Sequence, residues 1–157
     1  MDRFEKANDY HKKGFNCCQS VLAAFSDLTG LSEQASFDIG GGFGGGAGTG
    51  ELCGAISGAV MTLGLLTPAD PADPAGSKKR SVALSKELQK RFSEKFGALR
   101  CRELLQNKFT PDDTTPSTFF CFSWFSAFSK RDICRKSSEV RSVNFIKSKQ
   151  RSGLLGC

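Results

Sequence analysis

The sequence has no C-x-x-C pair, although seven of its 157 residues are cysteine. Zinc ribbons, thioredoxin-like dithiols and simple ferredoxin cluster sites depend on closely spaced pairs of that kind, so none of these classes is supported. Histidine is scarce as well, because His11 is the single one in the chain. A Cys–His catalytic pair would have to use His11, whose place beside the apolar face of a predicted helix favours an ordinary boundary residue.

Long apolar segments are also missing. The longest run, Leu52 to Leu66, is diluted with small residues and is shorter than the ~20 residues that a membrane-spanning helix needs. No apolar core of a secretory signal occurs in the charged N-terminus, MDRFEKANDYHKKGF. We therefore expect a soluble, cytoplasmic protein without a membrane span. In that compartment cysteines are kept reduced, bind metal or cycle in catalysis more often than they form structural disulfides.

Net charge is missing from most of the chain and gathers at one end. Residues 117–157 contain eight Lys or Arg and two acidic residues, a balance of +6 that equals the net charge of the whole chain. The same segment is rich in Ser and Phe and shows no sustained helical or strand period. No RNA- or DNA-binding motif accompanies its charges and rings, so nucleic acid is not an expected partner. We divide the chain into a helical, cysteine-containing domain, 1–116, and a basic, irregular tail, 117–157.

A glycine-rich stretch that leads into an apolar segment, Ile39 to Leu66, dominates the first domain. Glycine permits positive φ and close backbone approaches, so we expect a tight, crowded turn. Glu51 suits the first turn of a helix, and Cys53 would lie in the same turn, where a thiolate is stabilised and becomes a better nucleophile or metal ligand. Candidate contacts to an anion or cofactor are the backbone N–H groups of Gly44, Gly45, Gly46, Gly48 and Gly50.

Two amphipathic helices are predicted on either side of that stretch. Residues 3–28 have apolar residues every three to four positions, with Cys17 on the buried stripe. Cys18 lies about 100° round the same helix. A second helix follows the proline-rich segment after Leu66, with Ser77 as its N-cap and Gly97 at its C-cap. Its apolar residues recur every four positions, at Leu84, Leu88, Phe92 and Phe96.

A short helix over 100–106 is expected to hold Cys101 in its first turn, which repeats the placement of Cys53. Together with the helix that starts near Cys53, these elements predict an all-α fold. We expect a small bundle of about four helices, with a Gly-rich loop before the second helix and an irregular C-terminal tail.

Three segments resemble the cysteine elements of the C_GCAxxG_C_C family of redox-active proteins. Cys53-Gly-Ala-Ile-Ser-Gly58 is similar to the family's CGAxxG element. Segments 14–22 and 96–105, which carry Cys17 and Cys101, are similar to its first and third elements, and the three occur in the family's order. Cys18 stands where the family commonly has Ala and is interpreted as core. Residues 129–134 resemble the last element, so Cys134 is the predicted fourth cysteine and Cys121 the alternative.

The resemblance implies a mostly helical redox protein in which Cys17, Cys53, Cys101 and Cys134 converge on one site. In one hypothesis the four thiolates are ligands of an iron–sulfur cluster or another metal, and the protein carries electrons. In the other, Cys53 forms a reversible disulfide with Cys17 or Cys101, and the protein is a thiol–disulfide oxidoreductase or sensor. A third hypothesis is a small helical binding module whose cysteines only fill the core. The redox partner is unspecified, and small residues on the helix faces are compatible with a homodimer.

Overall fold

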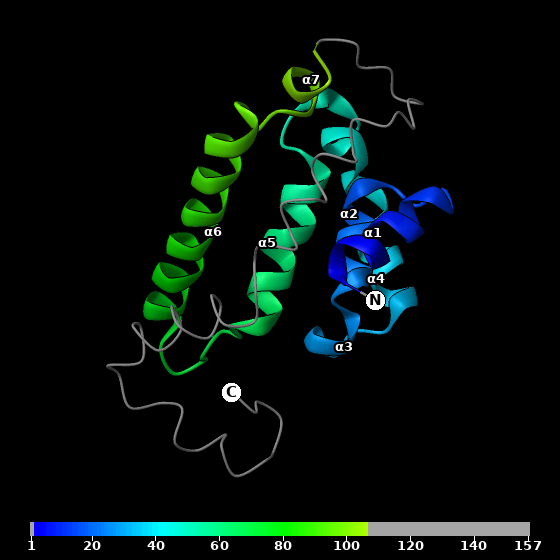
Figure 1. Cartoon of the computed structure of the whole chain (residues 1–157). Helices are drawn as coiled ribbons and strands as arrows, with labels where there is room; N and C mark the ends of the chain where they lie inside the picture. Colours follow the sequence, from blue (N-terminus) through cyan, green and yellow to red (C-terminus); the bar gives the residue numbers. More distant parts are fainter. Residues whose placement is uncertain (1, 107–157) are drawn as a thin grey trace. The chain divides into compact units, whose positions relative to one another are not determined.

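Every secondary-structure element in the described part of the chain is helical (Figure 1). The computed structural model describes residues 2–106, and for them the all-α prediction is confirmed. The elements are α1 (Arg3–Lys12), α2 (Cys17–Ala24), α3 (Ser26–Thr29), α4 (Glu33–Gly40), the short turns η1 (Gly41–Phe43) and η2 (Gly46–Gly50), α5 (Gly54–Leu66), α6 (Pro74–Phe96) and α7 (Cys101–Leu104). Predictions for the tail, which include Cys134 and its alternative Cys121, lie outside the described residues.

The single helix predicted over 3–28 is wrong, because the chain breaks there into α1, α2 and α3. Gly14 has a φ of +95°, which ends the first helix. Asn16 then starts α2 with a capping box, in which its side-chain oxygen accepts the Gln19 N–H at 3.0 Å and the Gln19 side chain accepts the Asn16 N–H at 2.9 Å. Because of this break, Cys17 is the first residue of a helix. In an unbroken helix it would lie in the interior.

α2 forms the centre of the described part. It packs against α1, α4 and α5, and all of its residues except Gln19 are buried. α5 approaches it closely through its small residues, since a Cβ on Gly58 would lie only 2.8 Å from the carbonyl oxygen of Cys18. The small residues of α5 therefore face α2 of the same chain. The proposed homodimer gains no support from this face.

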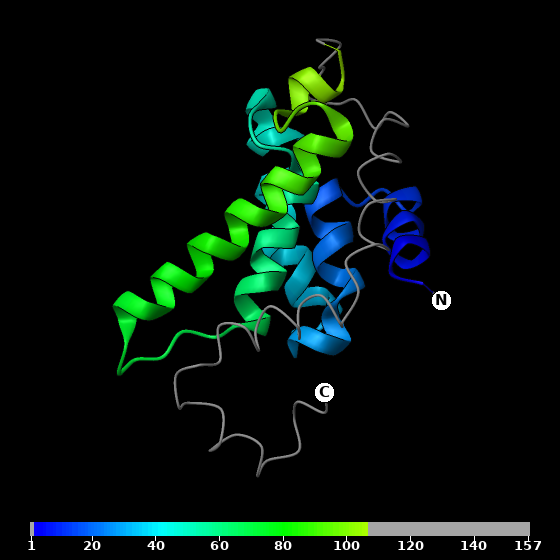
Figure 2. The ribbon, with the colours of Figure 1, turned by 60° about the vertical axis from the view of Figure 1, so that its left-hand side comes forward.

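α6 lies along the other side of α5 in both views (Figures 1 and 2). It buries Leu88 and Phe92, two of the residues whose spacing predicts it. It starts earlier than predicted, because Asp73 rather than Ser77 is its N-cap. Gly97 has the left-handed conformation expected of a C-cap residue, with φ +80°. Within residues 2–106, no helix combines the length and the apolar character needed to cross a membrane.

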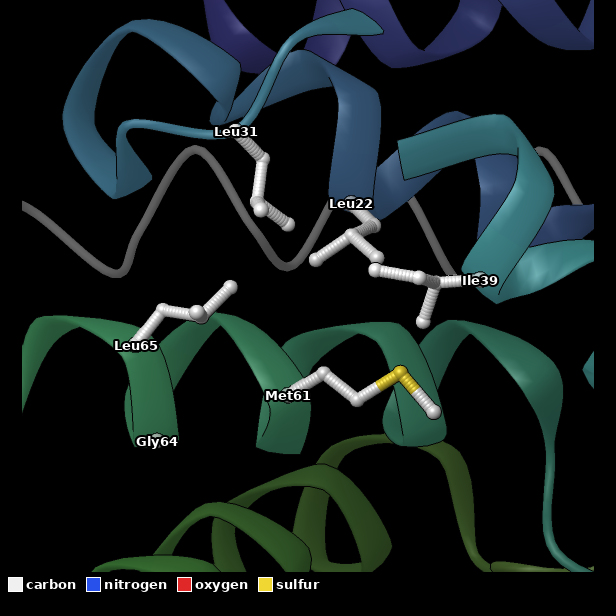
Figure 3. A pocket seen from close by; sticks show the side chains of 6 residues that line it. All are labelled: Leu22, Leu31, Ile39, Met61, Gly64 and Leu65. Carbon is white, nitrogen blue, oxygen red and sulfur yellow. The ribbon is translucent and has the colours of Figure 1, made fainter. Parts of the chain in front are cut away.

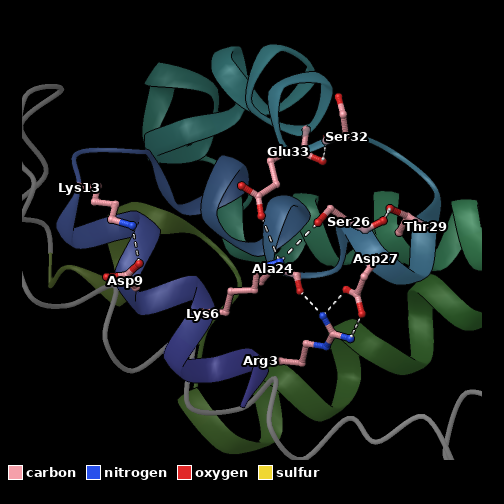
Figure 4. A network of polar contacts seen from close by, with 11 residues as sticks. Arg3, Lys6, Asp9, Lys13, Ala24, Ser26, Asp27, Thr29, Ser32 and Glu33 are labelled. Atoms are coloured by element: carbon pink, nitrogen blue, oxygen red, sulfur yellow. Dashed lines mark hydrogen bonds and ion pairs between the residues drawn. The ribbon is translucent and has the colours of Figure 1, made fainter. Parts of the chain in front are cut away.

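A network of polar contacts fastens α1 to the segment around α3 (Figure 4). The guanidinium of Arg3 donates to the carbonyl oxygen of Ala24 at 2.5 Å and pairs with the Asp27 carboxylate through both terminal nitrogens. Lys6 pairs with Glu33 at 3.3 Å. These contacts lie at the C-terminal end of α2, whereas Cys17 lies at its N-terminal end.

Candidate functional site

Three buried cysteines come together from helix starts that are far apart in the sequence. Cys17 is the first residue of α2, Cys53 is the N-cap residue of α5, and Cys101 is the first residue of α7. Their exposed fractions are 5%, 3% and 8%. Charge on Cys53 acts on the pKa of both Cys17 and Cys101, which shows that the three thiols share one region. The structure thus brings together the three predicted site cysteines that it describes.

An isolated β-bridge between Leu52 and Arg100 joins two of these helix starts. Beside it, the N–H of Cys53 donates to the carbonyl oxygen of Leu99 at 3.0 Å, and the N–H of Cys101 donates to that of Glu51 at 2.6 Å. Successive side chains of an extended segment point to opposite faces, so Cys53 and Cys101 share the face opposite Leu52 and Arg100. The bridge therefore fixes both cysteines against the same interior.

Cys17 reaches this interior because α5 begins with glycine. A Cβ on Gly54 would lie 2.4 Å from the Cys17 sulfur and 2.6 Å from the carbonyl oxygen of Phe43. Any larger residue would push α5 or the sulfur away. The backbone N–H of Gly45 also acts on the Cys17 thiol and lowers its pKa. Cys17 is thus held between the glycine loop and the residue that follows Cys53.

The glycine run is the crowded turn that the sequence predicts. Gly45, Gly46, Gly48 and Gly50 all have positive φ, and so does Ala47, with φ +56°. A Cβ on Gly46 would lie 2.5 Å from the backbone nitrogen of Glu51, which shows how tightly the loop folds back. The prediction that Glu51 lies in the first turn of a helix is wrong, because α5 starts at Gly54. Binding of an anion or cofactor by the loop stays a prediction.

Burial raises the pKa of two of the three thiols, those of Cys17 and Cys101. It is the main cause that takes the pKa of Cys17 to about 11, with the Cys53 charge next, although the backbone N–H of Gly45 opposes the rise. The pKa of Cys101 rises to about 12, again mainly through burial. The lowered pKa predicted for a cysteine at a helix start is therefore wrong for Cys101, because the loss of hydration outweighs the helix dipole. The thiols of Cys17 and Cys101 are therefore protonated at neutral pH.

Residues 15–151 match the family model described as "Putative redox-active protein (C_GCAxxG_C_C)". The chain belongs to the C_GCAxxG_C_C family. The match confirms the resemblance drawn from the cysteine segments, and it spans Cys17, Cys53, Cys101 and Cys134. Neither the curated proteins nor the solved structures contain a match. The family description supports redox activity and names no substrate, metal or partner.

The described residues do not by themselves form a metal site. Among residues 2–106, no three Cys, His, Asp or Glu side chains are arranged to hold a metal ion. The fourth predicted ligand, Cys134, lies outside those residues. Cys17, Cys53 and Cys101 therefore form a thiol cluster as they stand, and their role as metal ligands stays a hypothesis. His11 lies one helix away, with its Nδ1 2.8 Å from the carbonyl oxygen of Phe15.

Asn16 is a residue beside the thiol cluster whose contacts the sequence analysis missed. Its side chain donates to the carbonyl oxygens of Gly40 at 3.3 Å and Gly41 at 2.9 Å while it caps α2. The signal was present as Asn16-x-x-Gln19, which has the spacing of a capping box. This residue therefore joins the start of α2, and with it Cys17, to the start of the glycine run.

Asn16→Ala is expected to lower the free energy of unfolding by about 1–2 kcal/mol, because a cap and two long-range hydrogen bonds are lost together. Urea unfolding followed by circular dichroism measures the change. Asp2→Ala is the matched control, since Asp2 caps α1 with the same kind of box and makes no such long-range bond in the described residues. An Asn16→Ala effect no larger than that of Asp2→Ala would contradict a special role for Asn16.

A separate apolar pocket lies between α2, α4 and α5 (Figure 3). It has a volume of about 310 Å³ and is lined by Leu22, Leu31, Ile39, Met61, Gly64 and Leu65. None of the predicted site residues lines it. It offers no polar side chain to orient or activate a substrate, so it is not a catalytic centre. Under the binding-module hypothesis, a ligand would bind in this pocket.

Proposed function

We propose that the protein is a thiol–disulfide redox protein in which Cys53 and Cys17 alternate between two thiols and one disulfide. The observation that supports this most is the close contact of the Cys17 sulfur with Gly54, the residue that follows Cys53. Cys53 is also the largest electrostatic influence on Cys17. Cys101 approaches Cys53 across the bridge and is its other possible partner.

The reaction needs a partner that carries a disulfide. The Cys53 thiolate attacks one sulfur of the partner's disulfide, which forms a mixed disulfide and releases the other partner sulfur as a thiolate. The Cys17 thiolate then attacks the Cys53 sulfur, which closes the Cys17–Cys53 disulfide and frees the second partner thiol. Two electrons and two protons pass to the partner in total. The reverse sequence oxidises a dithiol partner.

The chain's own residues contribute positioning and proton control. The N–H of Gly45 stabilises negative charge on the Cys17 sulfur. Burial acts in the other direction and keeps the Cys17 thiol protonated until a partner or a rise in pH removes its proton. Small soluble disulfides should therefore react slowly, since reaction requires both access and a thiolate.

A second candidate function is electron transfer by an iron–sulfur cluster bound to Cys17, Cys53, Cys101 and Cys134. Two observations favour it: three helix starts bring thiols into one region, and the family match continues past Cys134. Four cysteines are the ligand number that such clusters use, and the cluster would supply one-electron chemistry. The candidate requires Cys134 and closer positions of the three described thiols than those observed.

Thiol counting and iron analysis on the same samples separate the two candidates. For the disulfide, oxidised and reduced protein should differ by two thiols, and Cys53→Ser or Cys17→Ser should abolish the difference. Cys18→Ser is the matched control, because Cys18 is buried beside Cys17 and has no part in the proposed reaction. For the cluster, anaerobic protein should hold stoichiometric iron, and serine at any of the four ligand positions should weaken it. If the samples contain no iron and show no reversible change in the number of thiols, the binding-module hypothesis remains.

A further inference from the structure

The C-terminal end of the glycine loop beside the thiols is bound by the side chain of Arg102. Its Nη2 donates to the carbonyl oxygen of Thr49 at 2.6 Å and to the Glu51 carboxylate at 2.7 Å. Its Nε donates to the carbonyl oxygen of Gly50 at 3.4 Å. All three acceptors lie about fifty positions earlier in the chain, and Arg102 directly follows Cys101. The side chain thus connects the third cysteine segment to the loop before the second.

The loop is poorly suited to hold its own shape. Ala47 has a left-handed φ of +56°, a conformation that costs a residue with a Cβ about 1 kcal/mol or more. Neighbouring glycines lose more conformational freedom on folding than any other residue type. A planar guanidinium that reaches several acceptors at once can compensate for this, because little side-chain freedom is lost per hydrogen bond. The contacts of Arg102 fall on the last residues of η2, where the loop meets Glu51.

The opposite end of the loop touches the proposed reaction centre. Gly45 directly precedes η2, and its backbone N–H lowers the pKa of Cys17. The Cys17 sulfur and the carbonyl oxygen of Phe43, two residues before Gly45, both lie against Gly54. Gly46 packs on the backbone of Glu51, which accepts the N–H of Cys101. Movement of the loop would therefore change the surroundings of Cys17 and of Cys101 together. Arg100 also pairs with the Glu51 carboxylate, at 3.3 Å, whereas Arg102 donates to two carbonyl oxygens of the loop as well as to this carboxylate.

We propose that Arg102 is a positioning residue for the thiol pair. By fixing the loop from Gly45 to Glu51, it holds the Cys17 sulfur in place beside Cys53 and so favours the disulfide over two separate thiols. The inference rests on the proposed Cys17–Cys53 disulfide. Its physical basis is effective concentration: two thiols that are held together form an intramolecular disulfide more readily than two that move independently.

The test is the equilibrium between dithiol and disulfide in glutathione or dithiothreitol buffers, followed by thiol counting. Arg102→Gln should lower the equilibrium constant for disulfide formation about tenfold, which is about 30 mV for this two-electron couple. Arg102→Lys should have an intermediate effect, because an ammonium group can replace some of the contacts but not the planar fork. A change in redox equilibrium is a readout that a purely structural role would not alter.

Arg3→Gln is the matched control. Arg3 also makes three long-range polar contacts, to Ala24 and Asp27 (Figure 4), and it lies at the end of α2 remote from Cys17. It should lower the melting temperature and leave the redox equilibrium unchanged. Equal equilibrium constants in wild type, Arg102→Gln and Arg102→Lys would overturn the proposal, and so would an equal shift in Arg3→Gln.

Two further outcomes are informative. If Arg102→Gln does not fold, Arg102→Lys and Glu51→Gln test the positioning role instead. Glu51→Gln keeps the backbone acceptors of Arg102, so it should shift the redox equilibrium less than Arg102→Lys. If the wild type itself shows no reversible loss of two thiols, the proposed function is wrong and the role of Arg102 falls with it. If instead the wild type forms the disulfide and the Arg102 variants form it equally well, only the positioning role is refuted.

Discussion

Gly54→Ala is expected to lower the free energy of unfolding by ~2–3 kcal/mol, whereas Gly64→Ala, in the same helix, is expected to raise it by ~0.5–1 kcal/mol. At position 54 the added methyl group would meet the Cys17 sulfur at 2.4 Å and the Phe43 carbonyl oxygen at 2.6 Å. At position 64 nothing lies within 4 Å of it. The second substitution therefore shows only the higher helix propensity of alanine.

The same pair of variants tests the site. Since the methyl group of Gly54→Ala must displace the Cys17 sulfur or the start of α5, the Cys17–Cys53 disulfide should form less readily. Gly64→Ala should form it as the wild type does. Urea unfolding gives the stability change, and thiol counting under oxidising conditions gives the redox change. A Gly54→Ala protein as stable as Gly64→Ala would mean that the close contact at the start of α5 does not constrain the fold.

Stability is expected to decrease steeply above pH 9 because the buried thiols must stay protonated. The pKa of Cys17 rises from 9.0 to about 11, and those of Cys18 and Cys101 rise to about 12, in each case mainly through burial. Below pH 9 folded and unfolded chains both hold these protons, so the contribution to stability is fully present. Above it the unfolded chain releases protons first, and the contribution is lost as the pH rises through the folded-state pKa values.

The expected magnitude is large for a protein of this size. The rise to about 11 at Cys17 alone corresponds to about 3 kcal/mol. Urea unfolding at a series of pH values between neutral and alkaline conditions measures the slope. Cys18→Ala removes one of the three protons, so its free energy of unfolding should depend less on pH, even though the smaller side chain lowers stability somewhat at neutral pH. Identical slopes for Cys18→Ala and wild type would show that Cys18 is not protected as the structure indicates.

The helices were predictable where the pattern is local. The four-residue spacing from Leu84 to Phe96 identifies α6, and Gly97 marks its end. The break between α1 and α2 was missed because Tyr10, Cys17 and Val21 continue one apolar stripe across it. Hydrophobic periodicity cannot reveal that a single residue has a positive φ. Gly14 is such a residue, and the chain turns there.

The site was predictable only in part, for a different reason. The sequence places Cys101 at a helix start, and the structure agrees. No local sequence pattern predicts the pairing of Leu52 with Arg100, which brings two of the helix starts together. Burial of the resulting cluster is a tertiary property as well, and burial rather than the helix dipole dominates the thiol pKa values. The contacts of Arg102 escaped prediction for the same reason, since their partners are remote in sequence.

The bridge between Leu52 and Arg100 has a consequence for synthesis of the chain on the ribosome. The first two cysteine segments emerge well before Arg100, and contacts between residues so far apart form late because a long loop must close first. Cys53, whose N–H is bonded to the carbonyl oxygen of Leu99 in the finished fold, therefore lacks the cover of that segment until the residues after α6 have left the exit tunnel. An oxidant present during that interval would find an accessible thiol that the finished fold later covers.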